Sequence, residues 1–156
     1  MRTLDRKLFE YTDFLTKASH DEAKLGNQLY VMTGIIQTYY EFISCILDNK
    51  TKTSNSQAEQ LKKLKTNCTI TEQQYNIMDE TRKLRNKLLH DLLYEPTAQE
   101  IINFHDKCLN NKPQLLAPKQ VEGQFVNSIL NGYCFIDAQL RSTIGIKFDE
   151  LQEEKV

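Results

Sequence analysis

The chain has 156 residues, of which 40% are hydrophobic and 26% are charged, and its formal net charge is −1. This length is typical of a single domain and is long enough to bury a core of its own. The composition excludes a wholly disordered chain, and the near-zero charge excludes a polybasic protein that binds nucleic acid by bulk electrostatics. Neither the composition nor the near-zero net charge excludes a small, local basic site.

Targeting signals and cysteine usage indicate a cytoplasmic protein. No apolar run typical of a secretory signal follows Met1, and the most apolar stretch, residues 29–47, is interrupted by too many polar residues for a membrane span. The four cysteines are widely spaced, with no CxxC pair, so neither a disulfide framework nor a zinc site is indicated. We therefore expect reduced, mostly buried thiols, no metal, no other cofactor and no membrane association.

The first two predicted helices follow from apolar residues at helical spacing. Leu4, Leu8, Tyr11 and Leu15 fall on one face of a helix. From Leu25 to Leu47 a broader stripe, which includes Tyr30, Tyr39, Tyr40 and isoleucines on more than one side, predicts a central, buried helix. We expect these tyrosines, and Tyr133 of the last helix, to serve in the core or an interface. A polar loop follows at residues 49–55.

Three capping boxes of the form S/T-x-x-E/Q predict the next helix starts, because the two side chains satisfy free amides at a helix N-terminus. The first box opens a short basic helix, the second a helix that ends near residue 91, and the third a helix that ends near residue 110. His105 lies on the inward stripe of that third helix, so we expect a core histidine with hydrogen-bond partners. The boxes pair Ser56 with Glu59, Thr71 with Gln74, and Thr97 with Glu100.

A last long helix is predicted from Val121 to beyond Leu140, with Gly132 inside it where another helix packs closely. A short strand at Thr143–Phe148 is a weaker alternative for the region that follows. The fold class is thus all-α, an up-and-down bundle of about four long helices plus short ones. Residues 1–148 form the single helical domain, and residues 149–156 form an acidic C-terminal tail that we expect to fray.

One segment of the capped helix at residues 71–91 contains side chains that could take part in catalysis or bind an anion. Four of the six residues from Arg82 to Lys87 are basic. Arg82, Asn86 and His90 are spaced by four residues and share one side of the helix, whereas Arg85 lies about 140° from His90. Arg85 and His90 therefore share a site only at an edge of the helix, at a distorted C-terminus, or across a dimer axis.

The sequence Arg85-Asn86-Lys87-Leu88-Leu89-His90 resembles the motif of the HEPN family (higher eukaryotes and prokaryotes nucleotide-binding domains). That motif is an Arg, often followed by a polar residue, with a His after four to six intervening residues, on a helix of an all-α bundle. The resemblance implies a metal-independent endoribonuclease that acts as a toxin, defence effector or RNA processor. It also implies a homodimer with a composite site, and an antitoxin or other regulatory protein as a further partner.

The residue chemistry is compatible with that implication. RNA carries its own nucleophile, the 2′-hydroxyl, and an imidazole such as His90 exchanges protons near neutral pH. Arg85 can stabilise charge that builds on phosphorus, and Asn86 can position His90 or a phosphate. These three residues are the candidate catalytic residues, and Arg82, Lys83 and Lys87 are the candidate RNA phosphate-binding residues.

Two readings without catalysis stay open. A basic helix face is often a solvated surface, and a histidine at a helix C-terminus can simply be stabilised by the helix dipole. The same helix could then serve a non-catalytic helical module that binds a protein or nucleotide, or a purely structural dimer.

Overall fold

The computed structural model describes residues 3–20, 28–52, 56–114 and 120–153, with residues 18–20 described by their backbone alone. Within these ranges the protein is all-α and contains no strand, which confirms the predicted fold class. The elements are α1 (Thr3–His20), α2 (Leu29–Leu47), α3 (Gln57–Thr66), α4 (Glu72–His90), α5 (Ala98–Phe104), the π-helix η1 (His105–Leu109) and α6 (Val121–Glu153).

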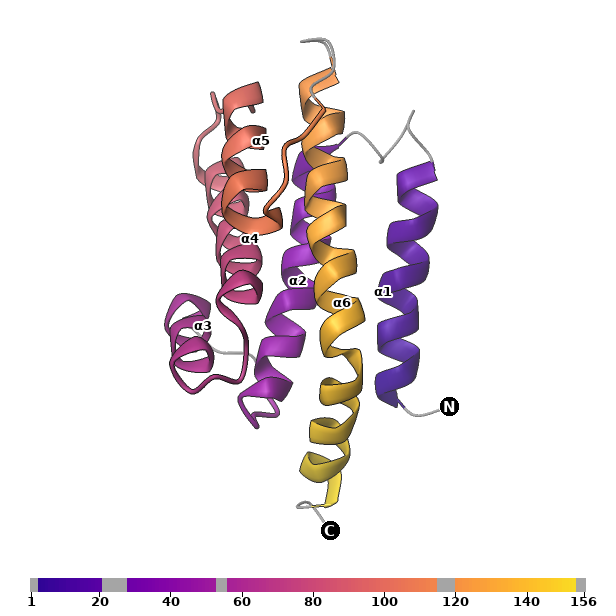
Figure 1. Ribbon diagram of the computed structural model, residues 1–156. Helices are drawn as coiled ribbons and strands as arrows, with labels where there is room; N and C mark the ends of the chain where they lie inside the picture. Colours follow the sequence, from indigo (N-terminus) through magenta and orange to yellow (C-terminus); the bar gives the residue numbers. More distant parts are fainter. Residues whose placement is uncertain (1–2, 21–27, 53–55, 115–119, 154–156) are drawn as a thin grey trace.

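Four long helices run alternately up and down, and the two short helices flank one side (Figure 1). Helix α2 lies between α4 and α6, and α1 packs on the opposite side of the bundle from α4. Helix α3 lies beside the start of α4, whereas α5 folds back along its end. The region of α4 that carries the predicted motif is therefore held between α2 on one flank and α5 on the other.

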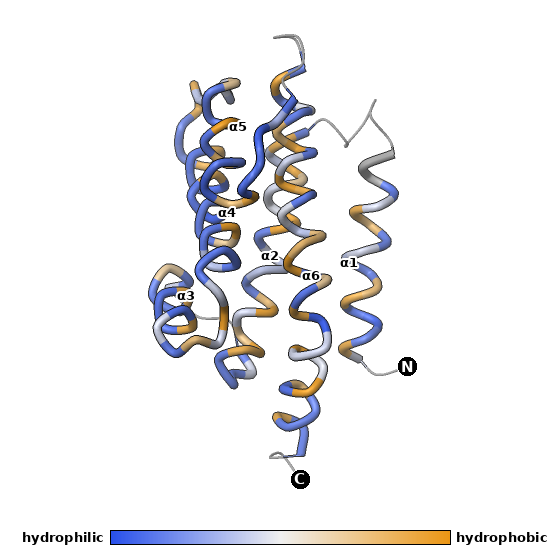
Figure 2. Tube along the Cα trace, in the orientation of Figure 1, coloured by the Kyte–Doolittle hydropathy of each residue, from blue (hydrophilic) through white to orange (hydrophobic). Residues whose placement is uncertain are grey.

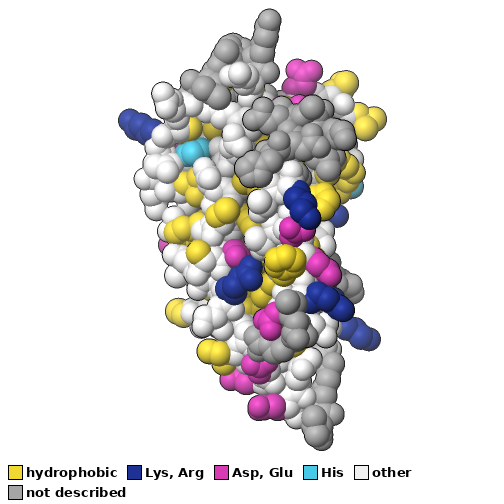
Figure 3. All heavy atoms as spheres, turned by 90° about the vertical axis from the view of Figure 1, so that its right-hand side faces the viewer, with side chains coloured by type: hydrophobic (Ala, Val, Ile, Leu, Met, Phe, Trp, Pro, Cys, Tyr) yellow, Lys and Arg dark blue, Asp and Glu magenta, His cyan; other side chains and the backbone are white. Residues whose placement is uncertain are grey.

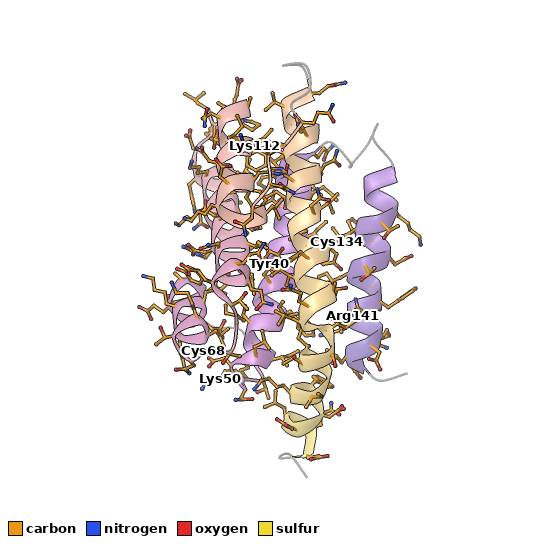
Figure 4. The ribbon with its side chains drawn as sticks, viewed as in Figure 1. Tyr40, Lys50, Cys68, Lys112, Cys134 and Arg141 are labelled. Atoms are coloured by element: carbon orange, nitrogen blue, oxygen red, sulfur yellow. The ribbon has the colours of Figure 1, made fainter. Side chains whose placement is uncertain are left out.

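The core is built around α2, as its broad apolar stripe predicted. Twelve of its residues are buried, and Figure 2 shows α2 as more apolar than the largely hydrophilic α3 and α4. Tyr40 lies in the interior of the bundle (Figure 4). The predicted close approach at Gly132 is confirmed, because a Cβ atom there would lie 3.0 Å from Cγ2 of Ile77 on α4.

Two of the three predicted capping boxes are formed. Thr71 accepts from the amide of Gln74 at 3.1 Å, and the amide of Thr71 donates to Gln74 Oε1 at 2.9 Å. Thr97 and Glu100 exchange the equivalent bonds at 3.2 Å. Ser56 occupies the N-cap position of α3, so the helix starts where predicted, but its side chain makes no capping hydrogen bond and the predicted box with Glu59 is wrong.

The C-terminal region corrects the sequence analysis. Residues 143–148 are helical, because α6 continues without a break to Glu153. Ile144 is buried, and Phe148 and Leu151 pack against the core, so the apolar stripe of α6 extends at helical spacing past Leu140. The weaker alternative of a strand at residues 143–148 is wrong, and the tail that we expected to fray from residue 149 is helical as far as Glu153.

Burial agrees with the predictions in part. Tyr39, Tyr40 and Tyr133 are buried in the core, whereas Tyr30 is 55% exposed and does not lie in the core. All four cysteines are free, as expected, but Cys68 and Cys134 are exposed while Cys45 and Cys108 are buried. Cys68 lies at the turn between α3 and α4 in Figure 4. The predicted helical position of Leu25 falls outside the described residues.

No helix among the described residues is long and apolar enough to cross a membrane.

Candidate functional site on helix α4

Helix α4 is firmly fixed at its N-terminal end. The Thr71 box caps it, and Gln74 donates to Gln139 Oε1 on α6 at 2.7 Å. Ile77, Met78 and Leu84 are buried against the neighbouring helices. A capped helix with a buried apolar face is a rigid support, so the side chains farther along it are held in place.

The helix ends at His90, because the next residue leaves helical geometry. Asp91 is extended (φ −112°, ψ 99°), and its amide still donates to the Lys87 carbonyl at 2.9 Å. The Asp91 carboxylate then accepts from the amide of Leu93 at 3.0 Å, which fixes the turn that follows. The side chains of Leu92 and Leu93 point into solvent and are 96% and 91% exposed. The apolar spacing of α4 predicts that Leu92 lies beside the core. This prediction is wrong because the helix ends at His90, two residues before Leu92.

The flank of α4 that faces α5 and η1 carries lysines that lie close to carboxylates, and we call it the paired flank (Lys83 and Lys87 on α4, Lys107 on η1, and their acidic partners). Lys83 lies 3.2 Å from Asp79 Oδ2 and 3.5 Å from Glu80 Oε1. Lys107 lies 2.7 Å from Glu80, and Lys87 lies 3.6 Å from Glu100 Oε2. The three lysines line a hollow of about 250 Å³ together with Glu80 and Glu100.

Asp79 joins Arg82 and Lys83 into one ion-pair cluster. It is 6% exposed, and the Arg82 guanidinium donates to its Oδ1 atom through Nε at 3.1 Å and Nη2 at 2.8 Å. Burial alone would raise the pKa of Asp79, but the hydrogen bonds and charges of Arg82 and Lys83 together lower it below its usual range. The same hydrogen bond with Asp79 raises the pKa of Lys83. With Lys87 beside Glu100, all three predicted phosphate-binding cations therefore already lie within 4 Å of a carboxylate in the fold.

The flank of α4 that faces α2 is different, and we call it the open flank. Here a groove of about 430 Å³ lies between α1, α2 and the end of α4. Its walls are mainly apolar or aromatic, and Arg85 is the single charged side chain that lines it. The lining residues are Tyr11, Tyr30, Val31, Gly34, Ile35, Thr38, Arg85 and Leu89.

Arg85 differs from the other arginines that the structure describes. Arg6 pairs with Glu10, Arg82 with Asp79, and Arg141 with Asp137. Arg141, labelled between α6 and α1 in Figure 4, also donates to Thr12 at 3.1 Å. Among the described arginines, only Arg85 has no carboxylate within 4 Å and no hydrogen-bond partner in the described part of the chain, although it is half-buried. A guanidinium presents a planar fork of donors that fits a carboxylate or phosphate, so Arg85 is available for an external anion.

Asn86 and His90 are both exposed, on the solvent side of α4 between the two flanks. On an ideal helix they are about 100° and 140° away from Arg85. The structure thus holds the predicted catalytic residues on one rigid helix end, but it directs Arg85 toward the groove and the other two toward solvent. Lys83 and Lys87 face the opposite flank, so a single chain does not gather the six predicted residues into one cleft.

The groove itself was not predicted from the sequence. Tyr30 was expected in the core or an interface, and neither Gly34 nor Leu89 was predicted to have a role of its own. The one available signal was Gly34 itself, because an isolated glycine inside a helical pattern is unfavourable unless packing or function requires it. No neighbouring atom lies within 4 Å of where a Cβ of Gly34 would stand, so this glycine leaves open space.

A second group of side chains has the arrangement of a hydrolase triad. His105 Nε2 lies 2.7 Å from Ser128 Oγ, and His105 Nδ1 lies 2.6 Å from Asn111 Oδ1. Ser128 is only 3% exposed, so a substrate has no access to this hydroxyl. The group satisfies a buried histidine and ties η1 to α6, which confirms the expected core role of His105.

The described part of the chain contains no group of three or more His, Cys, Asp or Glu side chains arranged to hold a metal ion. Comparison with known proteins gives no relative: no family model, no curated protein and no solved structure matches this chain. The candidate site is therefore assigned from the residues and geometry of this chain alone.

Proposed function

We propose that this protein is a metal-independent endoribonuclease of the HEPN type that cleaves single-stranded RNA, as a toxin, defence effector or RNA-processing enzyme. The observation that carries the proposal is the guanidinium of Arg85, which pairs with no described residue and lies five residues before an exposed histidine at the end of the same rigid helix. Its planar fork of donors matches phosphate oxygens, so this position suits a ligand phosphate.

The reaction uses the RNA 2′-hydroxyl as the nucleophile. His90 removes its proton while the oxygen attacks the adjacent phosphorus, and Arg85 stabilises the negative charge that builds on the phosphoryl oxygens. The bond to the 5′-oxygen breaks, and a protonated histidine supplies the proton that this leaving group needs. The products are a 2′,3′-cyclic phosphate and a 5′-hydroxyl, and the proton balance requires no metal-activated water.

Two copies of the chain are part of the proposal, because Arg85 and His90 point about 140° apart on one helix. A two-fold axis beside the end of α4 would bring His90 of one copy near Arg85 of the other. It would also supply two histidines, one to accept and one to donate a proton. Asn86, exposed between them, would orient His90 or a phosphate. Arg82, Lys83 and Lys87 would contribute long-range attraction for the RNA backbone.

The test is incubation of the full chain with single-stranded RNA in excess chelator, followed by analysis of the new termini. We expect cleavage that leaves cyclic phosphate and 5′-hydroxyl ends, and an apparent mass in solution twice that of one chain. Loss of all cleavage on chelation, or products with 5′-phosphate ends, would contradict the proposal. The matched control is His90→Ala, which removes an exposed side chain and leaves the core intact.

A second function is favoured by the exposed leucines after α4. Leu92 and Leu93 are almost fully exposed and stand next to the motif, which is typical of a surface that binds another protein. In this alternative the protein is a non-catalytic helical module, and α4 is its docking surface. It predicts that no RNA is cleaved, and that Leu92→Asp weakens partner binding more than His90→Ala does.

A further inference from the structure

The groove on the open flank has the dimensions and chemistry of a ligand site. Its volume of about 430 Å³ lies within the usual range for small-ligand sites. It shares Tyr11 and Ile35 with a second hollow of about 340 Å³ that continues along α1 to Lys7. A groove that continues in this way suits part of an extended chain better than a compact, enclosed molecule. Figure 3 shows the face that carries α1, where hydrophobic side chains reach the surface among charged ones.

Three features of the groove point to the same kind of occupant. Arg85 offers an anion site with no competing carboxylate among the described residues. Tyr30 stands on the groove wall with an exposed ring, which offers a stacking surface. Gly34 leaves room beside that ring, because nothing lies within 4 Å of the place a Cβ would take. A flat, apolar group joined to a phosphate matches this set.

We propose that this groove holds one unpaired nucleotide of the RNA, with its base against Tyr30 over Gly34 and its phosphate on Arg85. The inference rests on the proposed function for its choice of occupant, and it adds a base-binding subsite made by α2. Because every base has a π-face, stacking on Tyr30 would select an unpaired strand over a duplex without reading sequence.

The test measures binding without cleavage. The probe is a fluorescent single-stranded oligonucleotide made of 2′-deoxy residues, which has bases and phosphates but no nucleophile. Fluorescence anisotropy with the full chain gives the Kd, and circular dichroism checks that each variant folds. Tyr30→Ala should weaken binding roughly 5- to 150-fold, the range measured for loss of one stacked base. Gly34→Leu, which fills the groove, should weaken it at least as much.

Matched controls separate the groove from general surface effects. Phe9→Ala removes another exposed aromatic ring, 58% exposed on α1, and Thr143→Leu adds an exposed leucine on α6. Neither residue is among those that line the groove, and both variants should bind within twofold of the wild type. With an abasic probe of equal length, the effect of Tyr30→Ala should disappear, because no base remains to stack.

The inference fails if Tyr30→Ala and Gly34→Leu bind the probe as tightly as the wild type, or if the wild type does not bind it. It also fails if Tyr30→Ala weakens the abasic probe equally. These outcomes differ from failure of the proposed function: tight, Tyr30-dependent binding with no RNA cleavage overturns the nuclease but keeps the groove. Cleavage that is indifferent to Tyr30 and Gly34 keeps the nuclease and overturns the groove.

Discussion

The two flanks of α4 both carry basic side chains, but they differ in whether those side chains are paired with carboxylates. On the paired flank, Lys83, Lys87 and Lys107 lie within 4 Å of carboxylates on α4 and α5. On the open flank, Arg85 has no such partner among the described residues and lies in an apolar groove. On α4 itself, Lys83 and Lys87 have carboxylate partners and Arg85 has none among the described residues, so local basic charge is a poor guide to where an anion binds.

The contrast separates structural roles from functional ones. The lysines of the paired flank already lie beside carboxylates, so they gain little free energy when RNA binds. A half-buried cation with no partner is unfavourable in the free protein and gains most from a ligand. We therefore expect variants on the two flanks to differ in kind: those on the paired flank should change stability, and those on the open flank should change RNA cleavage or binding.

His90→Ala should have the largest effect of any single change. Removal of a general base or acid typically lowers a rate by about 10²–10⁴-fold. His90 is exposed at the end of α4, so its truncation should leave the thermal unfolding temperature unchanged. Single-turnover cleavage of labelled RNA measures the effect. A variant that cleaves at the wild-type rate would exclude His90 from the reaction.

Arg85→Ala should lower the cleavage rate by about 10²–10³-fold, comparable to the loss of one donor to a developing oxyanion. Because no described residue pairs with Arg85, its removal should not reduce the free energy of unfolding. Arg6→Ala is the matched control, since Arg6 is an exposed arginine paired with Glu10 on α1. Equal effects of the two variants on cleavage would mean that Arg85 contributes only general charge.

Asp79→Asn tests the paired flank and should act on stability. It breaks a largely buried ion pair with Arg82, so the free energy of unfolding should fall by about 1–3 kcal/mol. The folded-state pKa of Asp79 is lowered, so the wild type keeps this contribution above the usual aspartate range and loses it as the pH falls below about 4. Urea unfolding across that pH range should show this loss in the wild type and not in the variant.

The smallest effect is expected from Lys83→Ala and Lys87→Ala. Their ammonium groups are partly exposed and already paired, so each should change RNA affinity by at most about fivefold. Titration of an uncleavable RNA at two salt concentrations measures this. If either variant weakens binding more than Arg85→Ala does, the contrast between the flanks is wrong.

The sequence predicted what depends on near neighbours along the chain. The Thr71 and Thr97 boxes and the apolar stripes of α2 and α6 formed as their local spacing predicted. The Ser56 box has the same spacing and did not form, so spacing alone does not decide whether a box forms. Leu92 was misplaced because the apolar spacing of α4 continues past the point where Asp91 leaves the helix. The strand considered for residues 143–148 did not form, because Ile144, Phe148 and Leu151 continue the helical stripe of α6.

What the sequence could not supply were partners from other helices. Nothing in the segment Arg82–Lys87 distinguishes Lys87, which reaches Glu100 beyond a turn, from Arg85, which reaches no acid in the described chain. The exposure of Tyr30 likewise depends on how far α1 stands from the end of α4. Pairing and exposure of this kind are set by the tertiary fold, so the candidate residues could be named in advance but their division between two flanks could not.

Gly34 on α2 and Gly132 on α6 give a way to recognise which related chains share this groove. A Cβ at Gly132 would lie 3.0 Å from Ile77 Cγ2, so Ile77 would have to shift, whereas a Cβ at Gly34 would meet open space. A chain that keeps the first glycine and carries a larger residue at the second would retain the bundle with its groove closed. The residues at these two positions therefore indicate, from sequence alone, whether a related chain keeps the ligand site or only the fold.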